Sequence, residues 1–264
     1  MALEAALVEL QDLTERLRRE CPWDREQTVR TIVPHTVEEA YEVADAALGG
    51  APEKLVDELG DLLFQVYFLA LLLEEDGHGD LETVARTVHA KLVRRHPHVF
   101  GAAEARTAER VRERWEEIKS EQEGREGIFH DVPESLPALL LARKVQRRAA
   151  AVGYDWPDLE GPLAKLREEL GELEEELSST GATAPETEPD PAVFGEVGDL
   201  LFTVANVARK LNVDPELALR ATTRRFVQRV EQAEQLAEDA GLRWTGLDLE
   251  TQDRYYALAK EQLR

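Results

Sequence analysis

Residues 196–202 read EVGDLLF, and residues 58–64 of the same chain read ELGDLLF. Seven of nine positions are identical once both copies are extended by two residues, so the chain contains an internal repeat. Apolar residues recur in both copies with the period of an α-helix. The glutamate and the aspartate of each copy are three residues apart, which places both carboxylates on one helical face. The repeat therefore predicts two related helices, each with a pair of acids beside an apolar stripe.

A glycine lies between the two acids in each copy, as Gly60 and Gly198. A glycine inside a helix costs about 1 kcal/mol relative to alanine. The close approach of another helix or of a ligand is the expected reason for a glycine at this position.

A second acidic turn precedes each copy. Residues 38–42 read EEAYE and residues 168–172 read EELGE, with 15 residues between the two acidic turns in the first copy and 23 in the second. Either length lets two antiparallel helices face each other. A buried, unpaired carboxylate is costly, and a divalent cation with oxygen ligands neutralises it. The candidate metal ligands are Glu39, Glu42, Glu58 and Asp61 in the first copy, and Glu169, Glu172, Glu196 and Asp199 in the second.

Mg²⁺ is the expected ion, with Mn²⁺ as an alternative, because Mg²⁺ prefers oxygen ligands and keeps positions for substrate phosphates. The first acid of each upstream turn, Glu38 or Glu168, points about 100° away from its neighbour. Glu168 is therefore a catalytic candidate that positions the attacking water, and an exposed acid without a role is the alternative. For the whole acidic set, the alternative is a solvated surface.

Two further patterns repeat: a pair of cations four residues apart, and an aromatic residue four positions before a lysine. Each cation pair lies on one helical face and can bind phosphate oxygens, although ordinary ion pairing on a helix surface is the alternative. The cation pairs are Lys91 with Arg95 and Arg225 with Arg229, and the aromatic pairs are Trp115 with Lys119 and Tyr256 with Lys260.

The two copies differ beyond the acids: Asn206 and Arg209 in the second copy stand where the first has Phe68 and Leu71. Polar groups on that face suit a ligand site and apolar groups suit packing, so the second copy is favoured as the main catalytic unit. Lys54, one turn before the repeated glutamate, has no counterpart in the second copy. Both acidic sets are intact, so two working sites stay open. The candidate substrate contacts are Asn206, Arg209, Arg225, Arg229, Lys260, Lys91, Arg95 and, by stacking on a base, Trp156.

Composition narrows the class of protein. The 264 residues carry a net charge of −22, which argues against nonspecific binding to nucleic acid or to an anionic membrane. A single cysteine, Cys21, excludes an internal disulfide and fits a reducing cytoplasm. No basic segment followed by an apolar core opens the sequence, and the apolar run 62–73 is too short to span a bilayer. A cytoplasmic protein is therefore expected.

The pattern E-E-x-x-E followed by E-x-x-D resembles the signature of the MazG nucleoside triphosphate pyrophosphohydrolases. Three further stretches resemble the same family: CPWD at 21–24, RRHPHVF at 94–100 and VGYDW at 152–156. The resemblance extends over nearly the whole chain and includes the two-copy layout. It implies an all-α fold of two tandem MazG-like units, each of the four-helix-bundle type and completed by formation of a homodimer.

The resemblance also implies the reaction, which is hydrolysis of nucleoside triphosphates at the α-phosphorus to monophosphate and pyrophosphate. It further implies a role in clearing aberrant or excess nucleotides, and it favours the stretch RFVQR at 225–229 as a phosphate contact. Two other classes stay open. One is a noncatalytic acidic regulator that recruits a protein partner, and the other is a metal phosphohydrolase acting on nucleoside diphosphates or alarmones.

Glycines and prolines between the copies indicate a linker at 124–135, which separates a first domain at 1–123 from a second at 136–264. Residues 178–191, rich in small and polar residues, are expected to form a loop. Helices are expected at 2–20, 36–48, 53–75, 81–95 and 107–123, and then at 136–153, 161–177, 192–211, 215–240 and 250–263. For the helix at 36–48, Pro34 marks the start and Thr36 is the expected N-cap.

Overall fold

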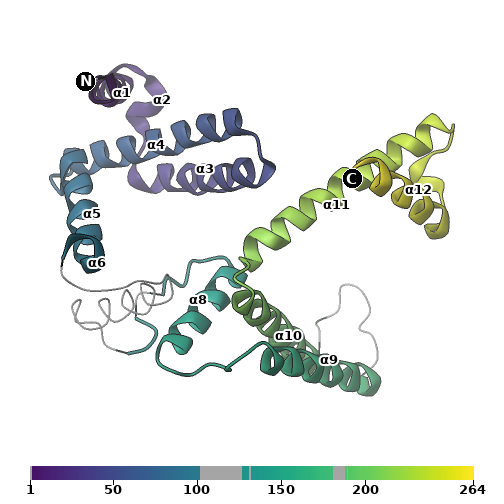
Figure 1. Ribbon diagram of the computed structural model, residues 1–264. Helices are drawn as coiled ribbons and strands as arrows, with labels where there is room; N and C mark the ends of the chain where they lie inside the picture. Colours follow the sequence, from purple (N-terminus) through teal and green to yellow (C-terminus); the bar gives the residue numbers. More distant parts are fainter. Residues whose placement is uncertain (1, 102–126, 131, 181–187, 189) are drawn as a thin grey trace. The chain divides into compact units, whose positions relative to one another are not determined.

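The computed structural model describes residues 2–101, 127–130, 132–180, 188 and 190–264. Over these residues the chain is helical and has no strand, which confirms the expected fold class. Contacts divide the chain into two compact units, Met1–Gly124 and Arg125–Arg264, which run from purple to teal and from teal to yellow in Figure 1. The domain limits expected from the sequence stay a prediction. The helix expected at 107–123, with Trp115 and Lys119, lies outside the described residues.

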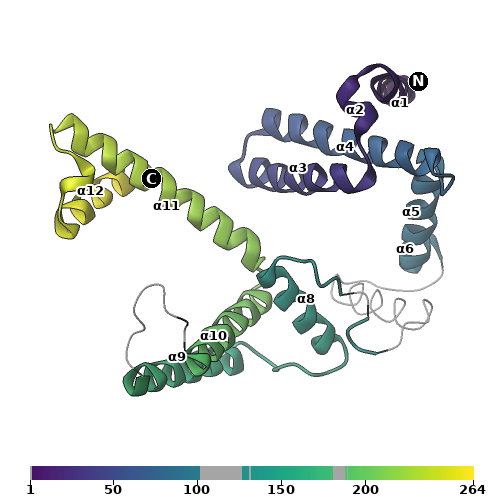
Figure 2. The same cartoon turned by 180° about the vertical axis from the view of Figure 1, so that it is seen from behind.

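The first unit is organised around two long antiparallel helices, α3 and α4, which lie side by side in both views (Figures 1 and 2). The chain turns between them at Gly50, whose φ of 69° is left-handed and suits glycine. The helices of this unit are α1 (Ala2–Glu20), α2 (Pro22–Glu26), α3 (Val29–Gly49), α4 (Pro52–Glu75), α5 (Leu81–Arg95) and α6 (Pro97–Phe100).

Helix α3 begins seven residues earlier than the sequence analysis expected, at Val29 instead of residue 36. Thr28 caps it: the Thr28 hydroxyl accepts from the Thr31 amide at 3.3 Å, and the Thr31 hydroxyl accepts from the Thr28 amide at 2.8 Å. This reciprocal cap satisfies two amides that a helix start leaves open. Pro34, which was expected to precede the helix, lies inside it, and the Thr36 hydroxyl donates to the Ile32 carbonyl instead of capping.

The core of the first unit is small. Ile32 from α3 packs with Phe68 and Leu72 from α4, and Phe64 and Leu69 lie against them. These residues fix the register of α3 against α4, and this register decides which carboxylates of the two helices meet.

The second unit repeats this arrangement with α9 and α10, which pack together as α3 and α4 do. Helix α8 packs against α10, and α12 packs against α11. Asp214 accepts from the Leu217 amide at the start of α11 and from Arg143 of α8 at 2.5 Å. The elements are α8 (Ala138–Ala151), α9 (Glu160–Thr180), α10 (Pro191–Lys210), α11 (Pro215–Asp239), the 3-10 turn η1 (Trp244–Gly246) and α12 (Leu249–Gln262).

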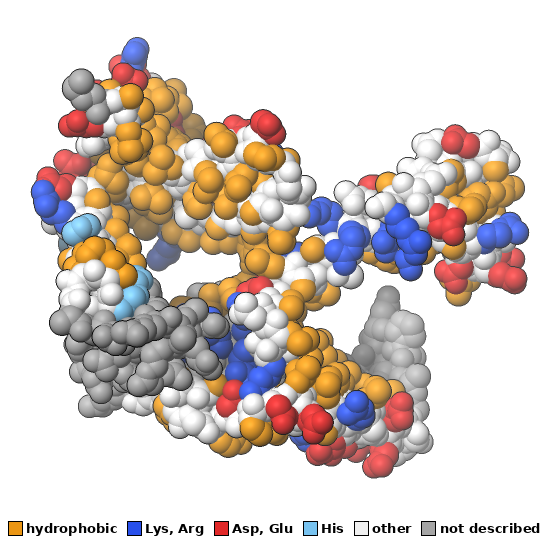
Figure 3. Space-filling model, viewed as in Figure 1, with side chains coloured by type: hydrophobic (Ala, Val, Ile, Leu, Met, Phe, Trp, Pro, Cys, Tyr) orange, Lys and Arg blue, Asp and Glu red, His pale blue; other side chains and the backbone are white. Residues whose placement is uncertain are grey.

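Large apolar side chains remain exposed along the long helices, and Figure 3 shows them gathered over α3 and α4. No atom lies within 4 Å of a Cβ built at Gly60 or Gly198, so the close approach expected there does not come from the described part of the chain. The most exposed members on α4 and α10 are Val56, Leu59, Phe194, Leu201 and Phe202.

One described helix, α10, is long and apolar enough to cross a membrane by length and composition alone. Only 17% of its apolar segment is buried against other described residues. The helix also carries Glu196 and Asp199, which belong to an acidic group described below.

Candidate metal centres

The first acidic group joins α3 to α4. Glu39 comes from α3, and Glu58 and Asp61 come from α4; one carboxylate oxygen of each lies within 4.8 Å of the others. Glu58 is buried, Glu39 is half-buried and Asp61 is exposed. Because Glu58 and Asp61 are three residues apart on one helix, they face the same point on α3. We call these three residues the first centre.

Glu39 lies among the carboxylates of both acidic turns of the first unit. Its Oε2 is buried and has no hydrogen-bond partner in the part of the chain that the structure describes. Burial raises the pKa of Glu39, and the carboxylates of Asp61, Glu42, Glu58 and Glu38 raise it further. A buried carboxylate oxygen without a donor, among other carboxylates, is suited to a hard divalent cation.

Two other residues border the first centre without joining its three-carboxylate group. Glu42, expected as a ligand, is exposed one turn along α3 and contributes through its charge. Lys54 lies one turn before Glu58, and its Nζ is 3.6 Å from Glu58 Oε1. The lysine side chain is 62% exposed, so it neutralises the group weakly.

The second centre has the same construction. Glu169 of α9 meets Glu196 and Asp199 of α10, again with one oxygen of each within 4.8 Å of the others. Glu169 is 5% exposed. Glu172 is exposed and stands outside this three-carboxylate group; loss of solvent and a hydrogen bond with Glu169 raise its pKa, and Lys165 opposes the rise. Glu169, Glu196 and Asp199 are the second centre.

Lys165 is a feature of this centre that the sequence analysis missed. Its Nζ lies 2.7 Å from Glu168, 2.8 Å from Glu169 and 4.0 Å from Glu172. The hydrogen bonds to Glu168 and Glu169 raise the pKa of Lys165. The sequence spacing could have predicted these contacts, because Lys165 stands three and four residues before Glu168 and Glu169, and side chains at that spacing come together on a helix. Glu168 faces Lys165 and is not part of the second centre.

Asn206 and Arg209 belong to a polar clamp at the end of α10. Asn206 is buried, and its Oδ1 accepts from Arg209 Nε at 2.9 Å. Arg209 also donates to both oxygens of Asp155, at 2.5 and 3.1 Å, and Lys210 donates to Asp155 at 2.9 Å. Burial alone would raise the pKa of Asp155, but these hydrogen bonds hold it below its usual range. The clamp fastens the segment after α8 to α10.

Trp156 lies at the edge of this clamp. Its backbone carbonyl accepts from Lys210, and its ring covers Gly161 so closely that a Cβ there would be 2.0 Å from the ring. The side chain is 42% exposed, so one part of it faces solvent.

The cations expected to bind phosphate lie on other helices. Arg225 is exposed and donates to Thr222, Arg229 is half-buried, and neither forms an ion pair with the second centre in the described part of the chain. Phe226 and Tyr256 bring α11 and α12 together, with ring centroids 5.9 Å apart. Lys260 of α12 is exposed, and Lys91 and Arg95 are half-buried on α5.

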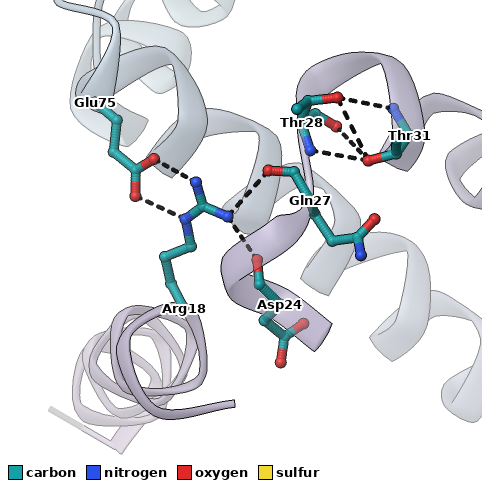
Figure 4. A network of polar contacts seen from close by, with 6 residues as sticks. All are labelled: Arg18, Asp24, Gln27, Thr28, Thr31 and Glu75. Atoms are coloured by element: carbon teal, nitrogen blue, oxygen red, sulfur yellow. Dashed lines mark hydrogen bonds and ion pairs between the residues drawn. The ribbon is translucent and has the colours of Figure 1, made fainter. Parts of the chain in front are cut away.

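An arginine clamp in the first unit holds α1 and α2 against α4 (Figure 4). Arg18 donates to both Glu75 oxygens at 2.8 and 2.7 Å, and to the carbonyls of Asp24 and Gln27 at 2.5 and 3.0 Å. Its guanidinium also stands 6.0 Å from the Phe68 ring. Gln27 directly precedes the cap of α3, so the clamp fixes the entry to the helix that carries Glu39.

Comparison with known proteins agrees with this construction. The family model described as MazG nucleotide pyrophosphohydrolase domain matches residues 27–100, a range that contains the first centre. The "Nucleoside triphosphate pyrophosphohydrolase" of Escherichia coli (strain K12) is 41% identical over 245 residues, which cover 92% of this chain and 91% of the relative. This chain belongs to the MazG family. The family expected from the acidic motifs is thereby confirmed.

Other relatives of this MazG chain differ in how much of it they cover. The "Nucleoside triphosphate pyrophosphohydrolase/pyrophosphatase MazG" of Thermotoga maritima is 40% identical over 257 residues, which cover 96% of this chain and 94% of the relative. A "Nucleoside triphosphate pyrophosphohydrolase" of Mycobacterium tuberculosis is 37% identical over 149 residues, which cover 56% of this chain and 46% of the relative. The first of these relatives extends over both units.

Proposed function

We propose that this chain hydrolyses nucleoside triphosphates to nucleoside monophosphate and pyrophosphate, with Mg²⁺ as its cofactor. The observation that carries the proposal is the pair of three-carboxylate centres, each built by two packed helices and each holding a buried glutamate. The names of the relatives that cover most of the chain point to the same reaction. The role that fits is removal of aberrant or excess nucleotides in the cytoplasm.

We assign the main chemistry to the second centre. Glu169, Glu196 and Asp199 hold the cation, with Glu172 beside them on the exposed side. When bound, a divalent cation supplies neutralising charge to the phosphates and acidifies a water molecule. Glu168 accepts a proton from the attacking water. Its exposed side chain and its place beside Glu169 support that role.

The reaction forms a bond between the water oxygen and the α-phosphorus and breaks the bond from that phosphorus to the oxygen shared with the β-phosphate. The leaving pyrophosphate carries several negative charges, and Arg225 and Arg229, one turn apart on α11, neutralise them. Asn206 and Arg209 shape the site from the clamp at the end of α10.

We also propose that the working molecule is a homodimer. The exposed apolar residues of α4 and α10, with open space beside Gly60 and Gly198, suit contact with helices of a second copy. Such a contact would supply the close approach that the two glycines predict.

Hydrolysis in ¹⁸O-labelled water tests the site of attack. The expected result is label in the monophosphate and unlabelled pyrophosphate. Label in the pyrophosphate would mean attack at the β-phosphorus, and diphosphate with labelled phosphate would mean attack at the γ-phosphorus. Either result would overturn the proposed reaction, as would the absence of turnover with every nucleoside triphosphate.

A further inference from the structure

The second centre contains its own cation. Lys165 Nζ contacts Glu168 and Glu169 at 2.7 and 2.8 Å, and the side chain is 36% exposed. Glu169 is shared, because it belongs both to these lysine contacts and to the three-carboxylate group. The ammonium of Lys165 therefore neutralises part of the carboxylate charge that would attract a divalent cation.

In the described part of the chain, the first centre has no equivalent lysine on α3. Position 35, which matches Lys165 in the repeat, is a histidine, and its Nδ1 lies 3.7 Å from Glu38. Lys54 reaches one oxygen of Glu58 at 3.6 Å from a side chain that is 62% exposed. Glu39 keeps a buried oxygen that has no hydrogen-bond partner among the described residues. Two centres with the same three ligand types thus differ in the positive charge that the protein itself supplies.

We propose that Lys165 is a built-in competitor for the cation of the second centre, so that the two centres bind the same divalent ion with different affinities, the first more tightly. The inference rests on the metal binding in the proposed function. A doubly charged ion at Glu169 repels an ammonium a few ångströms away, so the lysine must leave its contacts when the ion enters. The flexible four-carbon stem of Lys165 and its access to solvent allow that movement.

The Lys165 contacts also matter when no divalent cation is bound. While the ion is absent, Lys165 screens the repulsion between Glu168, Glu169 and Glu172, so that α9 keeps its acids together. Among the described lysines, Lys54 alone contacts the first centre, and this contact is weak. Metal binding should therefore stabilise the first unit more than the second.

A Mn²⁺ titration without nucleotide, with free ion counted by electron paramagnetic resonance, tests the proposal. Wild type should show a tight and a weak class of site. Glu58→Gln should remove the tight class and Glu196→Gln the weak one, which assigns each class to its centre. Lys165→Met should tighten the weak class by about tenfold. Lys165→Arg keeps the positive charge, so the weak class should stay weak. Lys54→Met is the matched control and should leave the affinity of the weak class unchanged.

Several results would overturn the inference: a single class of affinity in wild type, a tight class that Glu196→Gln removes, or a weak class that Lys165→Met leaves unchanged or weakens. Thermal unfolding of each variant shows that it is folded. Nucleotide turnover distinguishes this inference from the proposed function. If wild type hydrolyses nucleotides but Lys165→Met leaves the Mn²⁺ affinity unchanged, only the inference fails. If the Mn²⁺ affinities shift as predicted but no nucleotide is hydrolysed, only the proposed function fails.

Discussion

At the scale of single residues, the two units fasten their helices with oppositely arranged ion pairs. In the first unit the arginine is Arg18 on α1 and the acid is Glu75 at the end of α4. In the second unit the acid, Asp155, follows α8, and Arg209 stands on α10. Phe68 and Asn206, which occupy matching positions in the repeat, both meet a guanidinium. The clamp is thus common to both units although its residues differ.

The Asp155 clamp should make stability depend on pH at the acid end. The folded-state pKa of Asp155 is lowered, so its stabilisation is present above the ordinary pKa of an aspartate and is lost as pH falls through the folded-state value. Asp155→Asn should cost about 1–2 kcal/mol at neutral pH and almost nothing in strong acid. Urea unfolding at both pH values measures this. Asp253→Asn, at an exposed position of α12, is the control and should leave the free energy of unfolding unchanged at both pH values. An equal loss of stability in Asp155→Asn at both pH values would contradict the role of the Asp155 clamp.

The Trp156 ring should make a larger residue at position 161 destabilising. A Cβ at Gly161 would stand 2.0 Å from the ring, so Gly161→Ala should lower the free energy of unfolding by about 1–3 kcal/mol. Gly171→Ala is the control in the same helix, because nothing lies within 4 Å of its Cβ, and it should stabilise by about 0.5–1 kcal/mol. Equal effects of the two substitutions in thermal unfolding would count against the packing described.

At the scale of elements, helix starts were predictable where a single acid caps the helix. Asp80 accepts from the Thr83 amide and Asp214 from the Leu217 amide, and α5 and α11 begin directly after them as expected. The predicted start of α3 was wrong because Pro34 lies inside the helix, and the reciprocal cap of Thr28 and Thr31 starts it at Val29. The short helices α2 and α6 were missed, since four or five residues carry too little periodicity to be recognised.

The same limits apply to the candidate sites. The acids of the two centres follow from their spacing on two helices, so the sequence could predict them. Lys165 could have been found from its spacing, but its contacts depend on side-chain conformation. The clamp between Asp155 and Arg209 joins residues 54 positions apart, and only the packing of α8 against α10 brings them together.

The two possible starts of α3 can be distinguished by substitution. Thr28→Ala should cost about 1 kcal/mol of stability because it removes the cap that the structure describes. Thr36→Ala should cost little, because that hydroxyl only returns to the Ile32 carbonyl. Chemical unfolding of both variants measures the difference, and a larger loss from Thr36→Ala would restore the later start.

At the scale of the whole molecule, exposed apolar surface on α4 and α10 predicts self-association. Leu201 of α10 is 51% exposed, and Leu201→Glu should shift the protein from dimer to monomer in light scattering after size-exclusion chromatography. Leu3→Glu is the control, because Leu3 is 73% exposed but lies on α1, which is neither of the two helices that carry the proposed contact. A wild-type monomer, or a dimer unaffected by Leu201→Glu, would contradict the proposed assembly.

The central claim is that carboxylates of the second centre hydrolyse nucleoside triphosphates with Mg²⁺. Ion-exchange analysis of products tests it most directly, with each of the eight common nucleoside triphosphates, with and without Mg²⁺, on wild type, Asp199→Asn and Asp61→Asn. We expect monophosphate and pyrophosphate from wild type and Asp61→Asn, and a loss of at least about a hundredfold without Mg²⁺ or in Asp199→Asn. Undiminished turnover in Asp199→Asn, with loss in Asp61→Asn, would move the chemistry to the first centre and contradict the claim.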